Sequence, residues 1–131
     1  MLKVNIIAVG KLKEKYFTDA CNEYIKRLGA FCSISVTEIA EHKCPHEPSQ
    51  ADIAATVNDE SKRILAAVGA TDAVVALCIE GKEYSSEQLS KLIDDFKMRS
   101  SSGRVCFIIG GSWGLSDEVK RRADVRLSMS P

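Results

Sequence analysis

Residues 105–116 have the sequence Val-Cys-Phe-Ile-Ile-Gly-Gly-Ser-Trp-Gly-Leu-Ser, and this stretch indicates the class of fold. It begins with a continuous apolar run, which is typical of a strand covered on both faces of a parallel sheet. Gly110 and Gly111 end that strand, and Ser116 has the position and side chain of an N-cap for a short helix that continues to Arg122. The stretch therefore predicts a buried strand, a glycine-rich loop and a helix in succession.

The rest of the sequence continues this alternation of strand and helix. Apolar residues at the spacing of one helix face cover residues 17–28 and end at Gly29, which is expected in the C′ position. A second helix is predicted over residues 51–68 with Gly69 as its stop, and a third begins at residues 85–88, which have the form of a capping box. The expected strands cover residues 2–9, 32–39, 73–79, 105–109 and 125–129.

This order of elements predicts one α/β domain over residues 1–131, with a mostly parallel sheet and helices on both of its faces. Residues 73–79 are apolar throughout and are expected to form a central strand covered on both faces. Ligands of open parallel sheets bind beyond the carboxyl ends of the strands. The loops after Val9, Ile79 and Ile109 are therefore the expected sites of chemistry.

The composition describes a soluble globular protein. The 131 residues include 18 basic and 18 acidic side chains, and 45% of the chain is hydrophobic. The apolar runs are far shorter than the roughly 20 residues that cross a bilayer, so we expect a cytoplasmic protein without a membrane partner. Five cysteines without a C-x-x-C spacing indicate reduced thiols rather than a disulfide framework.

Residues 40–50 contain two prolines and several charges, and they are predicted to form an exposed loop. His42, Cys44 and His46 in this loop are ligand types that suit zinc, but their spacing matches no standard pattern and no fourth ligand is evident. We therefore predict no metal site. These are also the two histidines of the chain, and the sequence assigns no catalytic base.

The glycine-rich loop after residues 105–109 suggests a ligand site, because glycine lets the backbone approach a ligand closely and the N–H groups of a following helix attract anions. Residues 79–84 again place a glycine, Gly81, just after a buried strand. Two such loops side by side would form a pocket lined by backbone groups. Trp113 has two open interpretations: a hydrophobic lid on the core, or a surface for stacking or for a partner.

Five segments together resemble one protein family. They are residues 6–16, 23–28, 77–82, 107–116 and 122–128, of which Val-Gly-Lys-Leu-Lys-Glu-Lys-Tyr and Ile-Gly-Gly-Ser-x-Gly-Leu are the most specific. On these segments the chain resembles the RlmH-type SPOUT methyltransferases, which methylate N3 of a pseudouridine in bacterial 23S rRNA with S-adenosylmethionine. The likeness spans the whole chain.

The resemblance implies a SPOUT-type sheet whose C-terminal part forms a trefoil knot. It also implies that the cofactor, S-adenosylmethionine, binds between three loops in that part of the chain. The residues expected to hold the cofactor are Leu77, Ile79 and Gly81 in the first loop, Gly110 and Gly111 in the second, and Leu127, Ser128, Met129, Ser130 and Pro131 in the third.

Members of the family continue beyond the position of Pro131 with a segment that completes the knot, caps the cofactor and supplies much of the dimer interface. A chain that ends at Pro131 is therefore expected to form an incomplete knot. Catalysis of methyl transfer depends on holding donor and acceptor in attack geometry. For this reason we expect the 131-residue chain to bind S-adenosylmethionine weakly or not at all.

The expected partners are 23S rRNA within the ribosome and a second copy of the chain. Residues 1–30 carry a net charge of +3, residues 31–60 carry −5 and residues 104–131 carry +2, so the two basic ends would form a phosphate-facing patch if the fold brings them together. The candidate RNA contacts are Lys11, Lys13, Lys15, Lys120, Arg121, Arg122 and Arg126.

Two other functions stay open on the residues alone. The chain could be a non-catalytic α/β module that holds a nucleotide or a partner at residues 110–114. It could also be a flavodoxin-like protein that binds a phosphate-bearing cofactor, which a colourless protein would disfavour for a flavin.

Overall fold

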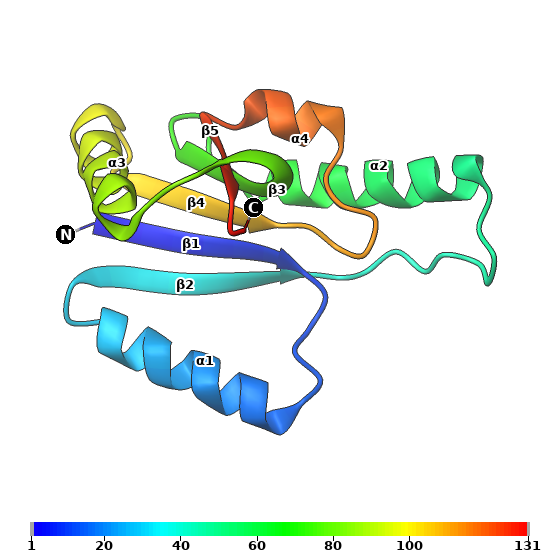
Figure 1. Cartoon of the computed structure of the whole chain (residues 1–131), viewed down its shortest axis with the longest axis horizontal. Helices are drawn as coiled ribbons and strands as arrows, with labels where there is room; N and C mark the ends of the chain where they lie inside the picture. The colour runs from blue at the N-terminus through cyan, green and yellow to red at the C-terminus, as the bar shows by residue number, and fades with distance from the viewer. Residues whose placement is uncertain (1, 131) are drawn as a thin grey trace.

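The computed structural model describes residues 2–130, in which strands and helices alternate along the chain (Figure 1). The strands are β1 (Leu2–Val9), β2 (Cys32–Ile39), β3 (Ala73–Glu83), β4 (Arg104–Ile109) and β5 (Val125–Ser128). The helices are α1 (Lys15–Leu28), α2 (Gln50–Ala66), α3 (Ser86–Arg99) and α4 (Asp117–Arg122).

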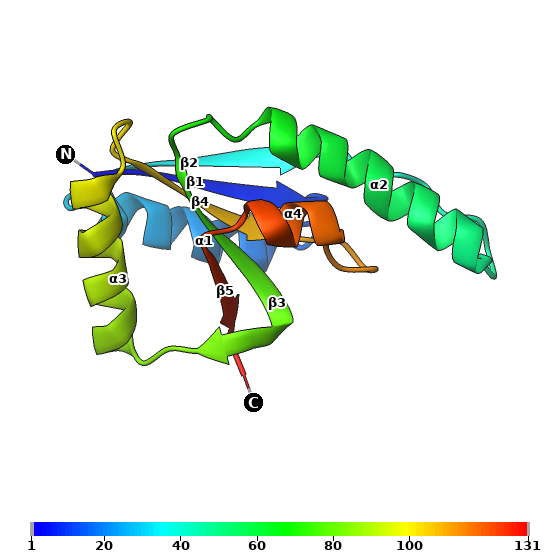
Figure 2. The same cartoon turned by 90° about the horizontal axis from the view of Figure 1, so that it is seen from above.

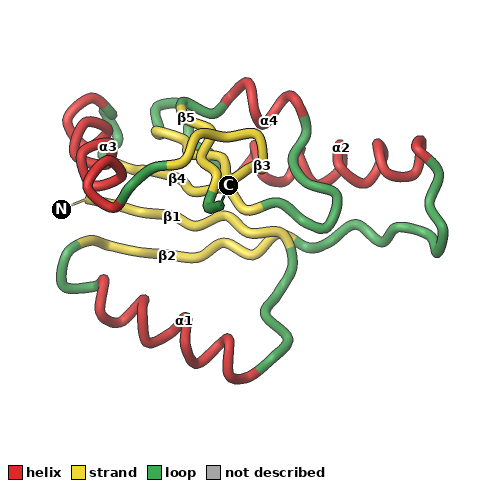
Figure 3. The backbone as a smooth tube through the Cα atoms, viewed as in Figure 1, coloured by secondary structure: helices red, strands yellow, loops and turns green. Residues whose placement is uncertain are grey.

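The strands form one sheet in the order β2-β1-β4-β3-β5, and every neighbouring pair is parallel. Figure 3 shows the strands as a continuous layer with helices on either side of it. From above, β3 and β5 are turned away from the direction of β1 and β2, as the twist of adjacent strands accumulates across a sheet (Figure 2). The predicted α/β class with a parallel sheet is confirmed.

Two apolar cores lie on the two faces of the sheet. On one face, Ile7 and Ile108 pack with Ile64 of α2 and Val119 of α4, and all four are buried. On the other face, strand residues such as Val75 pack against Phe96 of α3. Full burial of an Ile, Val or Phe side chain contributes about 1.5–3 kcal/mol. These cores hold the strand ends in fixed relative positions, and the predicted placement of helices on both faces is confirmed.

Helix α1 packs along β2 and leaves an open apolar groove. None of its residues, all of which the structure describes, is buried. A groove of about 510 Å³ lies between α1 and the sheet, with Tyr24 and Leu28 of α1 facing Ile6, Val36 and Ile109 of the strands. This groove is an apolar surface that the described residues leave partly uncovered.

Several predicted boundaries agree with the structure. Strands β1 and β2 have the predicted bounds, the capping box of Ser85 and Gln88 is present, and Ser116 caps α4 through the N–H of Val119. These signals are local, because each cap hydrogen bond joins residues only three apart in the sequence. Among residues 2–130, none of the helices has the length and apolar character to span a bilayer.

The predicted end of the first helix is confirmed, and that of the second is wrong. Helix α1 ends at Leu28, and Gly29 is its C-cap with φ −58°, in the right-handed region, and not a left-handed C′ residue. Helix α2 ends at Ala66, before the predicted stop at Gly69. The N–H of Gly69 donates to the carboxylate of Asp72, three residues further along the chain, at 2.8 Å. In both places the chain turns without the positive φ that a glycine signal predicts.

The predicted end of the third strand is also wrong. Strand β3 continues to Glu83 and contains a bulge, because Leu77 and Lys82 both pair with Leu127 of β5. Burial on both faces holds only for the first part of the strand, and Ile79 is 96% exposed. The apolar run predicted a buried strand as far as Ile79. Its neighbour β4, however, pairs with β3 only as far as Leu77.

Replacement of Gly81 by alanine is expected to destabilise the protein. A Cβ at this position would lie 2.7 Å from the carbonyl carbon of Leu127 and 2.8 Å from that of Arg126, which are backbone atoms that cannot rotate away. We expect Gly81→Ala to lower the free energy of unfolding, measured by urea titration, by about 1–3 kcal/mol. Gly29→Ala is the control and is expected to change it by less than about 1 kcal/mol; equal effects of the two substitutions would contradict this interpretation.

Candidate functional site

Three segments that the sequence singles out meet at the carboxyl edge of the sheet. Leu77 of β3 is paired in register with Ile109, the last residue of β4, and also with Leu127 of β5. Adjacent parallel strands lie about 4.8 Å apart, so the backbones that follow these residues start from neighbouring positions. The geometry therefore brings together the first, second and third loops that were proposed to hold one ligand.

The first segment is the bulge of β3 between Leu77 and Lys82. Gly81 within it lies directly against the backbone of β5. Glu80, also within the bulge, forms an ion pair with Lys120 of α4, and Arg126 donates from Nε to the carbonyl oxygen of Lys120 at 3.4 Å. The bulge is thus held on one side by β5 and on the other by the end of α4.

The second segment is a tight turn after β4. A Cβ on Gly110 would lie 2.9 Å from Cδ2 of Leu115, and one on Gly111 would lie 3.1 Å from Cγ1 of Val9. Gly111 and Gly114 form an isolated antiparallel bridge, and Gly114 has φ +79°, which favours glycine. These glycines let the turn fold tightly against β1 and the start of α4.

The third segment starts in β5. Leu127 and Ser128 are buried, and the Ser128 hydroxyl donates to the carbonyl oxygen of Ser130 at 2.7 Å. Met129 is 80% exposed. Pro131, which was also proposed as a cofactor residue, lies outside the described residues.

Large apolar side chains are exposed around this edge. Ile79 and Met129 are almost fully exposed, and Ile109 is exposed at the end of β4. An apolar side chain of this size is normally buried, and its exposure beside a cluster of glycine backbones is suited to a ligand that has both an apolar face and polar edges. An adenosyl group has these properties, so the residues present fit the donor that the resemblance implies.

Helix α2 anchors the second segment from the side. The Ser61 hydroxyl donates to the Ser116 hydroxyl at 2.5 Å, and that oxygen also accepts from the N–H of Val119. The buried carboxylate of Glu60 accepts from the N–H of His42 at 3.1 Å and lies next to Gly111. The sequence analysis missed Glu60, although one signal was present: it lies on the apolar stripe of α2, four residues before Ile64.

His42 belongs to this anchor. Its Nδ1 lies 2.9 Å from a carboxylate oxygen of Asp59, which Arg63 also contacts at 2.6 Å. The hydrogen bond with His42 lowers the pKa of Asp59. Arg63 in turn donates to the carbonyl oxygen of Ala40 at 2.7 Å. The described residues contain no group of three or more His, Cys, Asp or Glu side chains placed to hold a metal ion.

The seven basic candidates for RNA contact lie in different surroundings. Lys11, Lys13 and Lys15 are exposed after β1, at the carboxyl edge. Lys120 is engaged by Glu80, whereas Arg122 donates to the carbonyl oxygens of Gly69 and Asp72, which precede the amino end of β3. Arg121 and Arg126 are exposed. The first three are exposed candidates at this edge, whereas Arg122 is held at the amino edge.

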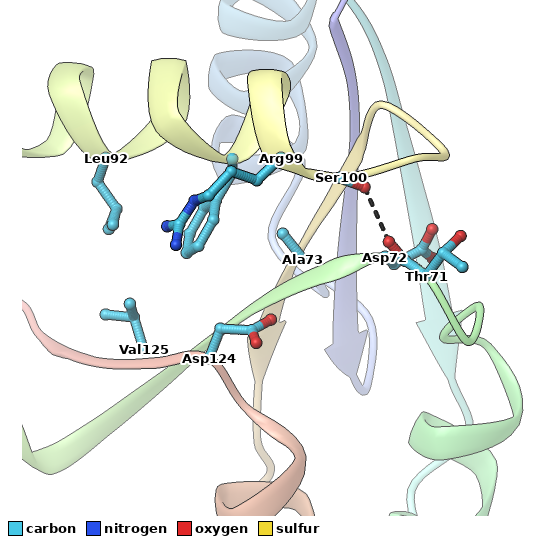
Figure 4. A pocket seen from close by; sticks show the side chains of 9 residues that line it. Thr71, Asp72, Ala73, Leu92, Arg99, Ser100, Asp124 and Val125 are labelled. Carbon is cyan, nitrogen blue, oxygen red and sulfur yellow. Dashed lines mark hydrogen bonds between the residues drawn. The ribbon is translucent and has the colours of Figure 1, made fainter.

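A separate pocket of about 350 Å³ opens at the opposite, amino edge of the sheet (Figure 4). Arg99 and Asp124 line it, and the Ser100 hydroxyl closes one side by donating to the carbonyl oxygen of Thr71 at 2.8 Å. Because parallel strands place their carboxyl ends together, this pocket lies away from the three segments. It contributes nothing to the site at the carboxyl edge.

Loss of the ion pair between Glu80 and Lys120 is expected to loosen the β3 bulge. The hydrogen bond from Lys120 lowers the pKa of Glu80, so the pair is intact above the ordinary glutamate pKa and is lost as the pH falls through the lower value of the folded protein. We expect Glu80→Gln to reduce the hydrogen-exchange protection of amides 78–82 at neutral pH.

The wild-type protein should approach the Glu80→Gln variant as the pH falls through that value. Glu23→Gln, which breaks the exposed ion pair with Arg27 on α1, is the matched control and should leave amides 78–82 unchanged. Identical protection of wild type and Glu80→Gln at neutral pH would show that the pair does not hold the bulge.

Comparison with known proteins gives a consistent result. A family model described as "Predicted SPOUT methyltransferase" matches residues 2–131. The protein named Ribosomal RNA large subunit methyltransferase H from Streptococcus thermophilus (strain CNRZ 1066) is 48% identical over 127 residues, which cover 97% of this chain and 79% of that protein. The protein of the same name from Clostridioides difficile (strain 630) is 43% identical over 129 residues, which cover 98% of this chain and 80% of that protein. The one from Desulfitobacterium hafniense (strain Y51) is 42% identical over 130 residues, which cover 99% of this chain and 81% of that protein. The matches extend over all three segments of the carboxyl edge, and the chain belongs to the SPOUT methyltransferase family.

Proposed function

We propose that this protein methylates large-subunit ribosomal RNA with S-adenosylmethionine, at N3 of a pseudouridine in 23S rRNA. The observation that carries the proposal is the pairing of Leu77 with both Ile109 and Leu127, which supports a single ligand site built from three segments. The relatives' names support rRNA as the substrate. The target atom rests on the family resemblance.

The donor would be held mainly by backbone groups. Leu77, Gly81, Gly110 and Gly111 would supply close backbone contact, and Ile79 would cover an apolar face of the adenosyl group. Leu127, Ser128, Met129, Ser130 and Pro131 would form the third wall. When bound, S-adenosylmethionine supplies an electrophilic methyl group on a sulfonium.

The chain contributes positioning to this reaction. A methyl group moves from sulfur to nitrogen by in-line displacement, and orientation of the two reactants is equivalent to about 10⁵–10⁸ M of reactant. The anchoring of the second segment by Ser61 and Glu60 of α2 supports such orientation, since it limits the movement of one wall. No described side chain is assigned as the base that takes the proton from N3.

Recognition of the substrate would use the exposed lysines Lys11, Lys13 and Lys15 for phosphates. A neutral chain suits an enzyme that recognises an assembled ribosomal particle, where shape and several weak contacts add together. A homodimer in the cytoplasm is part of this proposal, and the open apolar groove beside α1 supports association with further polypeptide.

The direct test is transfer of a labelled methyl group. The protein, as produced from its gene, is incubated with labelled S-adenosylmethionine and with ribosomes from a strain that lacks the homologous gene. We expect label in 23S rRNA, and mass spectrometry of its nucleosides should identify N3-methylpseudouridine. A binding module without catalytic activity would transfer no label while still binding the donor, and this outcome would overturn the proposal.

Replacement of Ile79 tests the donor site without disturbing the fold. Ile79 is exposed, so Ile79→Ala should leave the free energy of unfolding unchanged. In calorimetry on the protein as produced from its gene, loss of apolar contact worth about 1–2 kcal/mol should raise the Kd for S-adenosylmethionine by about 5- to 30-fold. Met98→Ala on α3 removes a similarly exposed side chain and is the control; equal donor affinity in both variants would remove Ile79 from the site.

The length of the chain gives a further prediction. The matched relatives are longer, since the matched region covers 79–81% of them. Calorimetry on residues 1–131 alone is expected to detect weak binding of S-adenosylmethionine or none, as the family resemblance implies. Tight binding by this 131-residue chain would contradict the prediction and would mean that the described segments suffice.

A further inference from the structure

Trp113 is the only tryptophan of the chain and lies at the tip of the second segment. It is 47% exposed, so about half of its surface is open to a partner. Trp normally buries a large apolar surface. A partly exposed indole in a functional loop therefore calls for an explanation other than core packing.

The turn that carries Trp113 is held rigidly. The N–H of Gly114 donates to the carbonyl oxygen of Gly111 at 3.1 Å, which closes the turn around Ser112 and Trp113. Beyond the turn, Leu115 is buried and Ser116 is bonded to Ser61 of α2. An aromatic side chain on such a support can bind a flat partner with little loss of backbone entropy.

The surroundings of the turn suit a nucleic acid. Gly111 packs on Val9, and the chain after Val9 continues into the exposed residues Lys11 and Lys13. These lysines border a hollow of about 370 Å³ that Glu38 and Glu41 also line. Because the acidic groups offset part of the positive charge, attraction of phosphates alone is weak here. Stacking on an aromatic ring adds affinity that does not depend on net charge.

We propose that Trp113 stacks on an unpaired nucleobase of the rRNA substrate, next to the nucleotide that is methylated. This inference rests on the proposed function, since it takes the substrate to be RNA and the donor site to be at the same edge of the sheet. Proteins recognise RNA largely through bases that are splayed from the helix and stacked on aromatic side chains. Trp113 is thus a residue of substrate binding, and it leaves the donor contacts to the glycines and Ile79.

The principal experiment compares three variants in the ribosome methylation assay. Trp113→Ala removes the ring, Trp113→Phe keeps a smaller one, and Phe31→Ala removes an exposed aromatic side chain that precedes the amino end of β2. We expect Trp113→Ala to lower kcat/KM for ribosomes by roughly 5- to 150-fold, the equivalent of one lost stacking contact. Trp113→Phe should recover part of this loss, and Phe31→Ala should match wild type.

A second measurement separates RNA binding from donor binding. Calorimetry should give the same Kd for S-adenosylmethionine in wild type, Trp113→Ala and Phe31→Ala. Since Trp113 is the single tryptophan, intrinsic fluorescence excited at a wavelength that tyrosine does not absorb reports on it alone. Titration with the single-stranded probe hexauridylate at low salt should quench this emission in wild type and in Phe31→Ala.

The outcomes decide between the alternatives. Unchanged kcat/KM for ribosomes in Trp113→Ala would overturn the inference. A loss of donor affinity equal to the loss in kcat/KM would also overturn it, because Trp113 would then contact the donor. Weaker self-association of Trp113→Ala in sedimentation would overturn it as well, because Trp113 would then lie in an interface between copies of the chain. If wild type methylates no ribosomes, the proposed function fails by itself, and the hexauridylate titration then decides the stacking: quenching supports it and constant emission overturns it.

Discussion

The site depends on one constraint, the parallel register that pairs Leu77 with Ile109 on one side and with Leu127 on the other. Backbone hydrogen bonds between the strands set this register, and the apolar cores on both faces keep it from slipping. A shift by one residue would turn Val75 and Val105 from one core to the other face. The three segments that follow these strands are therefore fixed in position before any ligand binds.

Close backbone packing adds a second level of order. At Gly81 the bulge of β3 touches the backbone of β5, and at Gly110 and Gly111 the turn after β4 touches Leu115, β1 and α2. In each case the space for a side chain is filled by protein atoms. These glycines shape the site chiefly by letting protein segments approach each other, which differs from glycines that only make room for a ligand.

Polar residues of α2 complete the support. Glu60 and Ser61 connect this helix to the loop after β2 and to the loop after β4, which are far apart in the sequence. Buried polar groups need partners, and these partners come from loops at the functional edge. These loops thus gain order from contacts with α2, while Ile79, Met129 and Trp113 near the carboxyl edge stay exposed.

The sequence by itself determined the order of strands and helices, the parallel α/β class, the caps of α3 and α4, and the glycine turn after β4. These features follow from periodicity and from contacts between residues close in the chain, which local sequence specifies. Only the tertiary structure decided that β3 bulges and continues to Glu83 and that Ile79 is exposed. The same holds for the hydrogen bond from Arg122 to the carbonyl oxygen of Asp72 at the amino edge, and for the position of Glu60 next to Gly111. The physical reason is that each of these depends on a partner many residues away, whose position is set by strand pairing and packing across the whole sheet.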